Sequence, residues 1–535
     1  MSVLCCLAWL IAGCSVPGPD HPADSYEIDF SLPPGSEVAG AIVFVVDGMN
    51  AEIFQQMLEA GQLPAFQKYF VDRGLYVPRA AANIPGVTLA NLTSLATGRF
   101  CGHHNIPGIN WFDRNTLIYR NYNTIAQKNT LDGDYQVPNI YEQFPRQTTV
   151  SIFFQPHRNT TKFIENWTSA GPMFGLGWYE RVDRLTLYRF HLVRQIAAAR
   201  RAWPAITVAY LLSPDFRGYG YGSGSEQYRD SLRHSDKQIG RVLADLESAG
   251  MLEKLHIALV SDHGMVDIRE HFVLDDYLRD MLGLNLACRE LWQTTPFEKR
   301  QEYYQQYQAV TYGSGDRYGA LCLRKPVCEN GKVVGWHDWL DRPGPADLAS
   351  YPTGRGIVDL PAHLAGLKQV DLVAWQVREN HVAVRNGLGV VHFTQPQGPA
   401  GLIWYQVVQG DDPLGYDALV PEHAGNGASP LAWLEATART EYPDLPAQIL
   451  AYFRSTRAGD IALFAAEGYD FRDVHNGGHG GFLHGEAFVP MAIAGPGIER
   501  QRLPIARTVD LVPTLLDLLG APPIEAADGR SLVKP

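Results

Sequence analysis

The chain has 535 residues, of which 46% are hydrophobic, and it carries a formal net charge of -12 at neutral pH. This length is enough for two or three domains, and the hydrophobic fraction is that of an ordinary globular protein. The negative charge argues against a nucleic-acid partner, because the phosphate backbone of DNA or RNA favours basic surfaces. The composition suits an enzyme that attracts anions only locally, over bound cations.

The first residues have the pattern of an export signal rather than of a fold element. Residues 3–13 are almost wholly apolar but too short to span a bilayer. The run ends in two small residues, and Cys14 follows directly, as in a bacterial lipobox, so Cys14 would be acylated and become the mature N-terminus. No Lys or Arg precedes the apolar run, and an uncleaved anchor is the alternative. We therefore predict a signal over 1–14, a tether over 15–37, and a periplasmic or outer-membrane lipoprotein of a bacterium.

Cysteine chemistry is not expected to carry the mechanism, because no metal-type Cys-x-x-Cys spacing occurs. An exported protein can still form disulfides. Four cysteines follow the signal and allow three pairings, between which the sequence does not choose: Cys101, Cys288, Cys322 and Cys328.

Strand and helix signals alternate from about residue 38 to residue 270. Short apolar runs predict buried parallel strands at 41–46, 206–212 and 257–260. Helical spacing between them predicts helices at 51–70 and 226–250. This alternation predicts an α/β fold with a mostly parallel central sheet and helices on both faces.

The amino-acid composition changes after residue 270, where aromatic residues, glycines and prolines become frequent. We predict a mixed α/β cap or insert over 271–454, with strands at 371–377 and 389–393. The main pattern then resumes, with strand runs at 460–466 and 488–495 and a closing amphipathic helix at 509–520. The predicted catalytic core therefore comprises 38–270 and 455–535.

Acidic residues follow three of the predicted core strands. Asp47 follows the first run, Asp215 the second, and Asp262 with His263 the third. Ligands of open parallel sheets bind just beyond the carboxyl ends of the strands, so these side chains would meet at one edge. His479 lies in a glycine-rich loop before a later strand and is expected at the same edge. Such a cluster predicts bound divalent cations, although Asp47 alone could also be a turn residue.

Thr88 is the candidate nucleophile. A Pro-Gly turn precedes it, and the following residues predict a helix whose free N–H groups and dipole would favour a phosphate. A threonine hydroxyl is a poor nucleophile unless a metal lowers its pKa. A simple helix-capping threonine is the alternative role, and Thr93 and Thr97 compete from less suitable places inside the helix.

Together these motifs resemble the alkaline phosphatase superfamily, most closely its branch of nucleotide pyrophosphatases and type I phosphodiesterases. The matching stretches are Val45–Gly48, Gly86–Asn91, Ser94–Arg99, Ser261–Met265 and His479–Gly481. The resemblance covers about 38–270 and 455–530. It implies a sheet of alkaline phosphatase type that carries two metal ions, most simply zinc.

The resemblance also implies a role for each matched residue. One ion would be held by Asp47, Thr88, Asp262 and His263, and the second by Asp215 and His479. Asn91 would donate a hydrogen bond to a non-bridging phosphate oxygen. The expected course is a phosphothreonine at Thr88 and its hydrolysis, with two cations about 4 Å apart holding both apical oxygens.

One residue departs from the family pattern, which has a histidine four residues after the second aspartate. This chain has Tyr219 there. Tyr219 would have to ionise to bind well, or His475 or His484 would supply the missing ligand. The site is then complete with an altered ligand, or binds a single or weak second ion, or belongs to a degenerate relative that binds without turnover.

We therefore predict an exported, lipid-anchored, metal-dependent phosphohydrolase that cleaves phosphodiester or pyrophosphate bonds in a small phosphorylated substrate. A phosphomonoesterase or phosphonate hydrolase on the same fold and a non-catalytic surface-binding protein are the alternatives. Arylsulfatase chemistry is disfavoured, because Cys101 lacks the Pro and Arg of a C/S-x-P-x-R setting.

Overall fold

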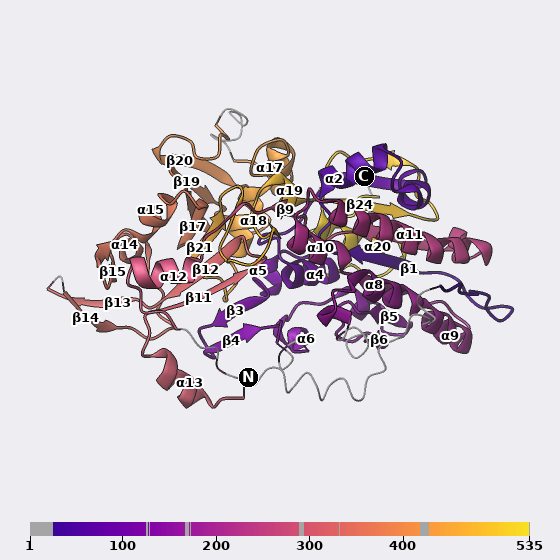
Figure 1. Ribbon diagram of the computed structural model, residues 1–535, viewed down its shortest axis with the longest axis horizontal. Helices are drawn as coiled ribbons and strands as arrows, with labels where there is room; N and C mark the ends of the chain where they lie inside the picture. Colours follow the sequence, from indigo (N-terminus) through magenta and orange to yellow (C-terminus); the bar gives the residue numbers. More distant parts are fainter. Residues whose placement is uncertain are drawn as a thin grey trace. The chain divides into compact units, whose positions relative to one another are not determined.

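A computed structural model of the protein describes residues 25–124, 127, 129–165, 171, 173–287, 291, 294–330, 332–417 and 427–533 (Figure 1). The chain divides into two compact units. Unit 1 comprises the described residues within Met1–Ala80, Pro138–Gly264 and Val489–Pro535, and unit 2 those within Ala81–Val137 and Met265–Phe488. The predicted export signal with Cys14, and Cys288, lie outside the described residues.

Unit 1 is built on a mostly parallel sheet, which confirms the predicted fold class. Among the residues described, its strands are β1 (Ala41–Val46), β2 (Gly74–Ala81), β5 (Thr149–Ile152), β6 (Lys162–Ile164), β7 (Ile206–Leu211), β8 (His256–Val260), β24 (Phe488–Ala494), β25 (Gln501–Arg502) and β26 (Ala506–Arg507). Their order is β25-β2-β24-β8-β1-β7-β5-β6, with β26 paired to β2. β1 is wholly buried and runs parallel to both β7 and β8, whereas β24 is antiparallel to β8.

The helices of unit 1 follow the predicted spacing, with one interruption. They are α2 (Ala51–Glu59), α3 (Pro64–Phe66), η1 (Gln67–Val71), η2 (Ile140–Gln143), α8 (Tyr179–Tyr188), α9 (Phe190–Arg200), α10 (Ser213–Tyr221), α11 (Glu226–Ser248), η3 (Leu252–Lys254), η5 (Thr508–Asp510) and α20 (Leu511–Leu518). The helix expected over 51–70 breaks after Glu59, because Gly61 turns the chain with a φ of +68°, and Pro64 starts a new helix at its first turn. α11 buries the stripe that the spacing marked, including Tyr228, Leu232 and Ile239.

Unit 2 contains an antiparallel sheet with its own apolar core. In the described part of the chain its strands are β11 (Ala309–Ser314), β12 (Tyr318–Leu323), β17 (Val370–Arg378), β18 (His381–Arg385), β19 (Gly389–Thr394), β20 (Trp404–Gly410) and β21 (Ile461–Ala465). Their order is β11-β12-β21-β17-β18-β19-β20. The strands predicted at 371–377 and 389–393 are confirmed. β21 pairs antiparallel with β12 and β17, so it lies in this sheet and not in the sheet of unit 1. The predicted division into core and insert stays a prediction.

The remaining elements of unit 2 are short. They are α4 (Thr88–Thr97), α5 (Cys101–His104), β3 (Asn110–Asp113), β4 (Ile118–Asn121), α6 (Leu131–Asp134), β9 (Val266–Asp267), β10 (Glu270–His271), α12 (Leu274–Asp276), η4 (Tyr277–Met281), α13 (Phe297–Tyr304), β13 (Pro326–Glu329), β14 (Lys332–Trp336), α14 (Pro345–Leu348), β15 (Tyr351–Thr353), β16 (Gly356–Val358), α15 (Leu360–Ala365), α17 (Pro430–Thr437), α18 (Leu445–Tyr452), β22 (Tyr469–Asp470), β23 (Gly477–Gly478) and α19 (His484–Ala487).

Two further findings concern the predicted compartment. Cys101, Cys322 and Cys328, the cysteines within the described ranges, form no disulfide. None of the helices that the structure describes combines the length and the apolar character needed to cross a bilayer.

Candidate functional site

Asp47 and Asp262 lie side by side because the strands before them pair in parallel. β1 and β8 are neighbours with Val45 opposite Val260, so the residues two positions later also face each other. β7 pairs with the other side of β1, and Asp215 follows it in the first turn of α10. Three adjacent parallel strands thus place three aspartate side chains at one edge of the unit 1 sheet.

Asp47, Asp262 and His263 form a buried group whose ligand atoms all lie within 4.8 Å of one another. Nε2 of His263 is 3.3 Å from Oδ1 of Asp47 and 3.4 Å from Oδ2 of Asp262. A tetrahedral zinc ion with bonds of about 2.0–2.1 Å places its ligand atoms about 3.3–3.5 Å apart. The three side chains therefore have the spacing of ligands of one cation.

The hydrogen bonds around this group fix which atoms face its centre. Nδ1 of His263 lies 3.0 Å from the carbonyl oxygen of Gly264. A carbonyl can only accept, so Nδ1 carries the proton and Nε2 bears the lone pair. Within the described ranges, Oδ1 of Asp47 and Oδ2 of Asp262 have no hydrogen-bond partner. Two carboxylate oxygens and a nitrogen lone pair thus face one another, an arrangement that a divalent cation would stabilise.

The electrostatics lead to the same conclusion. Burial, and then the charge of Asp262, raise the pKa of Asp47 well above its usual value. Burial raises the pKa of Asp262 to about 7 and lowers the pKa of His263 to about 4. Without a cation, these groups favour their neutral forms, and a bound ion would replace the carboxyl protons. The residues present therefore fit a metal ion.

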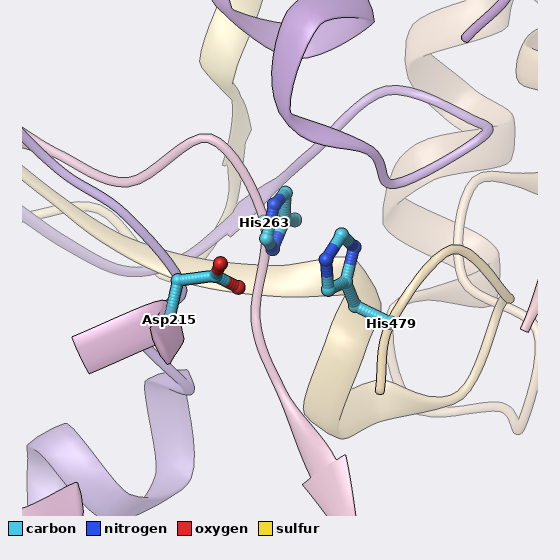
Figure 2. A group of neighbouring side chains, drawn as sticks. All are labelled: Asp215, His263 and His479. Carbon is cyan, nitrogen blue, oxygen red and sulfur yellow. The ribbon is translucent and has the colours of Figure 1, made fainter. Parts of the chain in front are cut away.

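Asp215 stands at the same edge of the unit 1 sheet. One of its carboxylate oxygens lies within 4.8 Å of a ring nitrogen of His263, and Figure 2 shows the carboxylate pointing toward that ring. Gly48 makes this approach possible, because a Cβ at its φ of +73° would lie 2.9 Å from the Cα of Asp215. The backbones after β1 and β7 are thereby held in direct contact.

A buried carboxylate from another helix holds the start of α10. Asp183 of α8 accepts hydrogen bonds from the backbone N–H groups of Leu212 at 2.8 Å and Ser213 at 3.1 Å. These are helix-terminal donors that lack intrahelical partners. Burial raises the pKa of Asp183 to about 7. Asp183 therefore fixes the position of the turn that carries Asp215.

Tyr219 lies one helical turn after Asp215 on α10. Residues four apart on a helix are neighbours on its surface, so both side chains share one face. Tyr219 is partly exposed, whereas Asp215 is buried. Its role as a metal ligand stays a prediction.

In unit 2, Thr88 is the first residue of α4, the position expected for the candidate nucleophile. It is partly exposed, whereas Leu89 and every later residue of the helix are buried. The hydroxyl groups of Thr93 and Thr97 each donate a 2.7 Å hydrogen bond to the carbonyl four residues earlier. Thr88 is therefore the threonine of this helix whose position suits a nucleophile.

Asn91 is buried beneath the loop that leads to Thr88. Its Oδ1 accepts a hydrogen bond from the N–H of Asn83, and its Nδ2 donates to the carbonyl groups of Asn83, Pro85 and Val87. These contacts fix the turn before α4. Its predicted contact with a phosphate oxygen stays a prediction.

His479, the third side chain labelled in Figure 2, belongs to unit 2 and directly follows β23. It is buried, and its Nδ1 lies 2.6 Å from the carbonyl oxygen of Gly86, two residues before Thr88. The carbonyl accepts, so Nδ1 carries the proton and Nε2 bears the lone pair. His479 and His263 therefore have the same tautomer, in which a histidine can bind a metal through Nε2.

The two other histidines of this segment contact different partners. Nδ1 of His475 pairs with the carboxylate of Asp316, and Nε2 of His484 contacts the carbonyl of Thr440. Whether either supplies a further ligand stays open as a prediction.

Sequence reasoning missed several residues that hold the site in place. Asp183 supports Asp215, and the hydroxyl of Tyr210 donates to Oδ2 of Asp47. Around His479, the supporting residues are Gly315, Arg317 and Glu486. Tyr210 was detectable as a polar group inside an apolar run. The others carry no local signal, because their partners are distant in sequence.

Comparisons with known proteins identify the family of the chain. A family model described as Type I phosphodiesterase / nucleotide pyrophosphatase matches residues 41–317, more than half of the chain. The ectonucleotide pyrophosphatase/phosphodiesterase family member 1 of Rattus norvegicus is 22% identical over 324 residues, which cover 57% of this chain and 32% of that protein. The bis(5'-adenosyl)-triphosphatase ENPP4 of Bos taurus is 23% identical over 239 residues, covering 43% of this chain and 48% of that protein.

The aligned part spans about a third to a half of these curated relatives. The matched region contains Asp47, Thr88, Asp215, Asp262 and His263. The chain belongs to the type I phosphodiesterase / nucleotide pyrophosphatase family.

Proposed function

We propose that this chain is a metal-dependent phosphohydrolase that cleaves phosphodiester or pyrophosphate bonds through a phosphothreonine at Thr88. The observation that carries the proposal is the buried group of Asp47, Asp262 and His263, which converges beyond the ends of β1 and β8. Membership of the family supports the reaction class. The names of the relatives support a small phosphorylated substrate, and the net charge of -12 supports the absence of a nucleic-acid partner.

Two divalent cations, most simply zinc, would be held by the residues that the family pattern assigns. The first would be held by Asp47, Thr88, Asp262 and His263, and the second by Asp215 and His479 with Tyr219 as a third ligand. When bound, the ions lower the pKa of the threonine hydroxyl, offset charge on the leaving group and activate water.

The residues of the chain then perform a two-step displacement. Oγ1 of Thr88 loses its proton to solvent and attacks phosphorus, and the bond to the leaving oxygen breaks in line with the new one. Water attacks the phosphothreonine, the bond from phosphorus to Oγ1 breaks, and Oγ1 regains a proton. The N–H groups at the start of α4 favour the phosphate charge during both steps. Asn91 would donate to a non-bridging oxygen by releasing one of its bonds to the turn, because its Nδ2 carries two hydrogens and both face backbone carbonyls.

We also propose that the protein is exported, with a lipid on Cys14. The apolar run over 3–13 and the small residues before Cys14 support this proposal. The body of the protein would then lie in the periplasm or at the outer membrane, tethered by residues 15–37.

The substitution Thr88→Ala tests the reaction directly. We expect it to reduce turnover of a bis-aryl phosphate by roughly 10³–10⁶-fold, as removal of a nucleophile does elsewhere, while the metal content stays unchanged. Metal would be counted per chain after gel filtration, and turnover followed by release of the phenol.

Thr93→Ala is the matched control, because Thr93 is on the same helix but its hydroxyl bonds to a backbone carbonyl. It should keep both metal and turnover. Unchanged turnover in Thr88→Ala would place the nucleophile elsewhere. Preference for a mono-aryl phosphate would favour the phosphomonoesterase alternative, and bound metal without turnover of either ester would favour the non-catalytic one.

A further inference from the structure

Arg317 and Glu486 form an ion pair that is wholly buried in unit 2. Nε of Arg317 lies 3.1 Å from both carboxylate oxygens of Glu486, and both side chains have 0% exposure. Burying two charges carries a large desolvation cost, and apolar residues of similar size often replace such pairs without loss of stability. Stability alone is therefore a poor explanation for this pair.

The carboxylate side of the pair holds the loop that follows His479. Oε2 of Glu486 accepts a 2.9 Å hydrogen bond from the N–H of Gly481, and Oε1 accepts one from the N–H of Leu483 at 3.3 Å. A side chain at 481 would collide with this carboxylate, because its Cβ would lie 2.5 Å from Oε1. Two residues after His479, the backbone is thus fixed by a buried charge.

The guanidinium side of the pair anchors the same loop to the sheet of unit 2. Arg317 donates to the carbonyl groups of Ala465 at 2.9 Å and Ala466 at 3.0 Å, and also to that of Tyr469. These carbonyls belong to the end of β21 and the turn that follows it. The rigid fork of the guanidinium therefore connects Glu486 to a strand.

Arg317 also contacts His479 through its own backbone. Its N–H donates to the carbonyl of His479 at 3.1 Å, and the N–H of His479 donates to the carbonyl of Gly315 at 2.7 Å. The peptide groups on both sides of His479 are thus held, and Nδ1 is held by Gly86. Every one of these contacts lies within unit 2.

We propose that the Arg317–Glu486 ion pair is a positioning device for His479, which sets the affinity of the second metal ion. This inference rests on the proposed function, because it assigns His479 to that ion. The pair orients Nε2 of His479 by fixing the backbone before and after this residue. Metal binding then costs little conformational entropy, because the side chain is already in place. Outer partners of metal ligands typically change metal affinity by about 10–100-fold.

The test replaces both charges at once, as Arg317→Met together with Glu486→Leu. Removal of one charge alone would leave the other buried and unpaired, so that loss of folding could mask the effect. Five backbone groups lose a buried partner in the double variant, so we expect it to unfold at a lower temperature than the wild type, and zinc affinity is measured well below that temperature. The affinity of this variant for the second zinc ion, measured by competition with a chromophoric chelator, should fall about 10–100-fold.

The matched control is a second buried ion pair of unit 2, Arg114–Asp460, whose side chains are 4% and 3% exposed. It has the same design, since Arg114 donates to two carbonyls and Asp460 accepts from the N–H of Leu323. None of the hydrogen bonds described for it reaches the residues 479–483. Arg114→Met with Asp460→Leu should therefore leave both zinc affinities unchanged.

Three results would overturn the inference. One is wild-type affinity for both ions in the Arg317–Glu486 variant, and another is an equal loss of affinity in the control. The third needs no substitution, because the Gly481 amide of metal-free wild-type protein should resist hydrogen exchange, and exchange at the rate of an open loop would contradict a held backbone. Failure of the proposed function is distinguishable, since wild-type protein would then bind no zinc or release no product.

Discussion

Tyr219 stands where the family pattern has a histidine, and the chemistry of its phenol would decide how a second ion is held. A neutral imidazole binds a cation through a lone pair, whereas a phenol with a reference pKa near 10 must first ionise. Both His263 and His479 contact a backbone carbonyl through Nδ1, so the lone pair of each ring lies on Nε2, the atom that is proposed to bind a metal.

The substitution Tyr219→His should therefore keep or raise both zinc content and turnover. The new imidazole would lie one turn after Asp215, on the same face of α10. Zinc per chain and turnover of a bis-aryl phosphate are the two measurements. Loss of metal in this variant would contradict a ligand role at position 219.

Tyr219→Phe is the complementary control, because it removes only the oxygen. If that oxygen binds the ion, the affinity for the second zinc should fall by at least about 10–100-fold. An unchanged affinity would show that Asp215 and His479 hold the ion with another partner.

At the scale of elements, the loops after the strands determine where the candidate ligand side chains lie. Gly315 follows β11 with a φ of +65°, and the ring of His479 fills the space where a side chain would stand. A Cβ there would lie 2.6 Å from Nδ1 and 2.8 Å from Cε1 of that ring. The loop after β11 is thus shaped to receive the imidazole, as Gly48 is shaped to receive Asp215.

Gly315→Ala should both destabilise the protein and weaken metal binding. The left-handed backbone costs an L-residue about 1–2 kcal/mol, and the collision would push the imidazole out of place. Gly398→Ala is the control, since Gly398 has a φ of +75° and no atom of the described chain lies within 4 Å of the place that a Cβ would take. Denaturant unfolding should show the larger loss of stability in Gly315→Ala, because the collision adds to the backbone strain that both variants share, and only Gly315→Ala should lose zinc. Equal zinc in the two variants would argue against a role for this loop.

At the scale of the whole molecule, the bound ions should stabilise the fold as well as support catalysis. Burial keeps the carboxyl groups of Asp47 and Asp262 in their neutral forms, and a cation between them would bind to both in the folded protein by replacing their protons. An ion at a free concentration 100 times its Kd contributes about 2.7 kcal/mol. A chelator should therefore lower the unfolding temperature, and added zinc should restore it.

The double substitution Asp47→Asn with Asp262→Asn provides the control for this prediction. It replaces two carboxyl groups that could ionise around a cation with neutral amides of nearly the same shape, so its unfolding temperature should no longer respond to the chelator. A response as large as that of the wild type would mean that the stabilising ions bind elsewhere.

Much of the fold could be predicted from sequence because buried strands and amphipathic helices leave local patterns. β1, β7 and β8 appeared as apolar runs, and parallel pairing then placed Asp47 and Asp262 together. β21 could not be assigned to its sheet, because a short buried run looks the same in parallel and antiparallel surroundings. The supporting roles of Asp183 and Glu486 could not be predicted for another reason. A carboxylate that accepts hydrogen bonds from a distant loop has no periodicity to reveal it.

The place of β24 in its sheet has a consequence for synthesis. It lies between β2 and β8, yet more than two hundred residues separate Val260 from Phe488. At 5–20 residues per second, a ribosome needs roughly 10–45 s to cover that distance. Throughout this interval one side of β8 has no neighbour, and an open strand edge is a template for aggregation. The strand that covers this edge emerges only after the strands of the unit 2 sheet, and a nascent chain stalled before Val489 would expose one edge of β8.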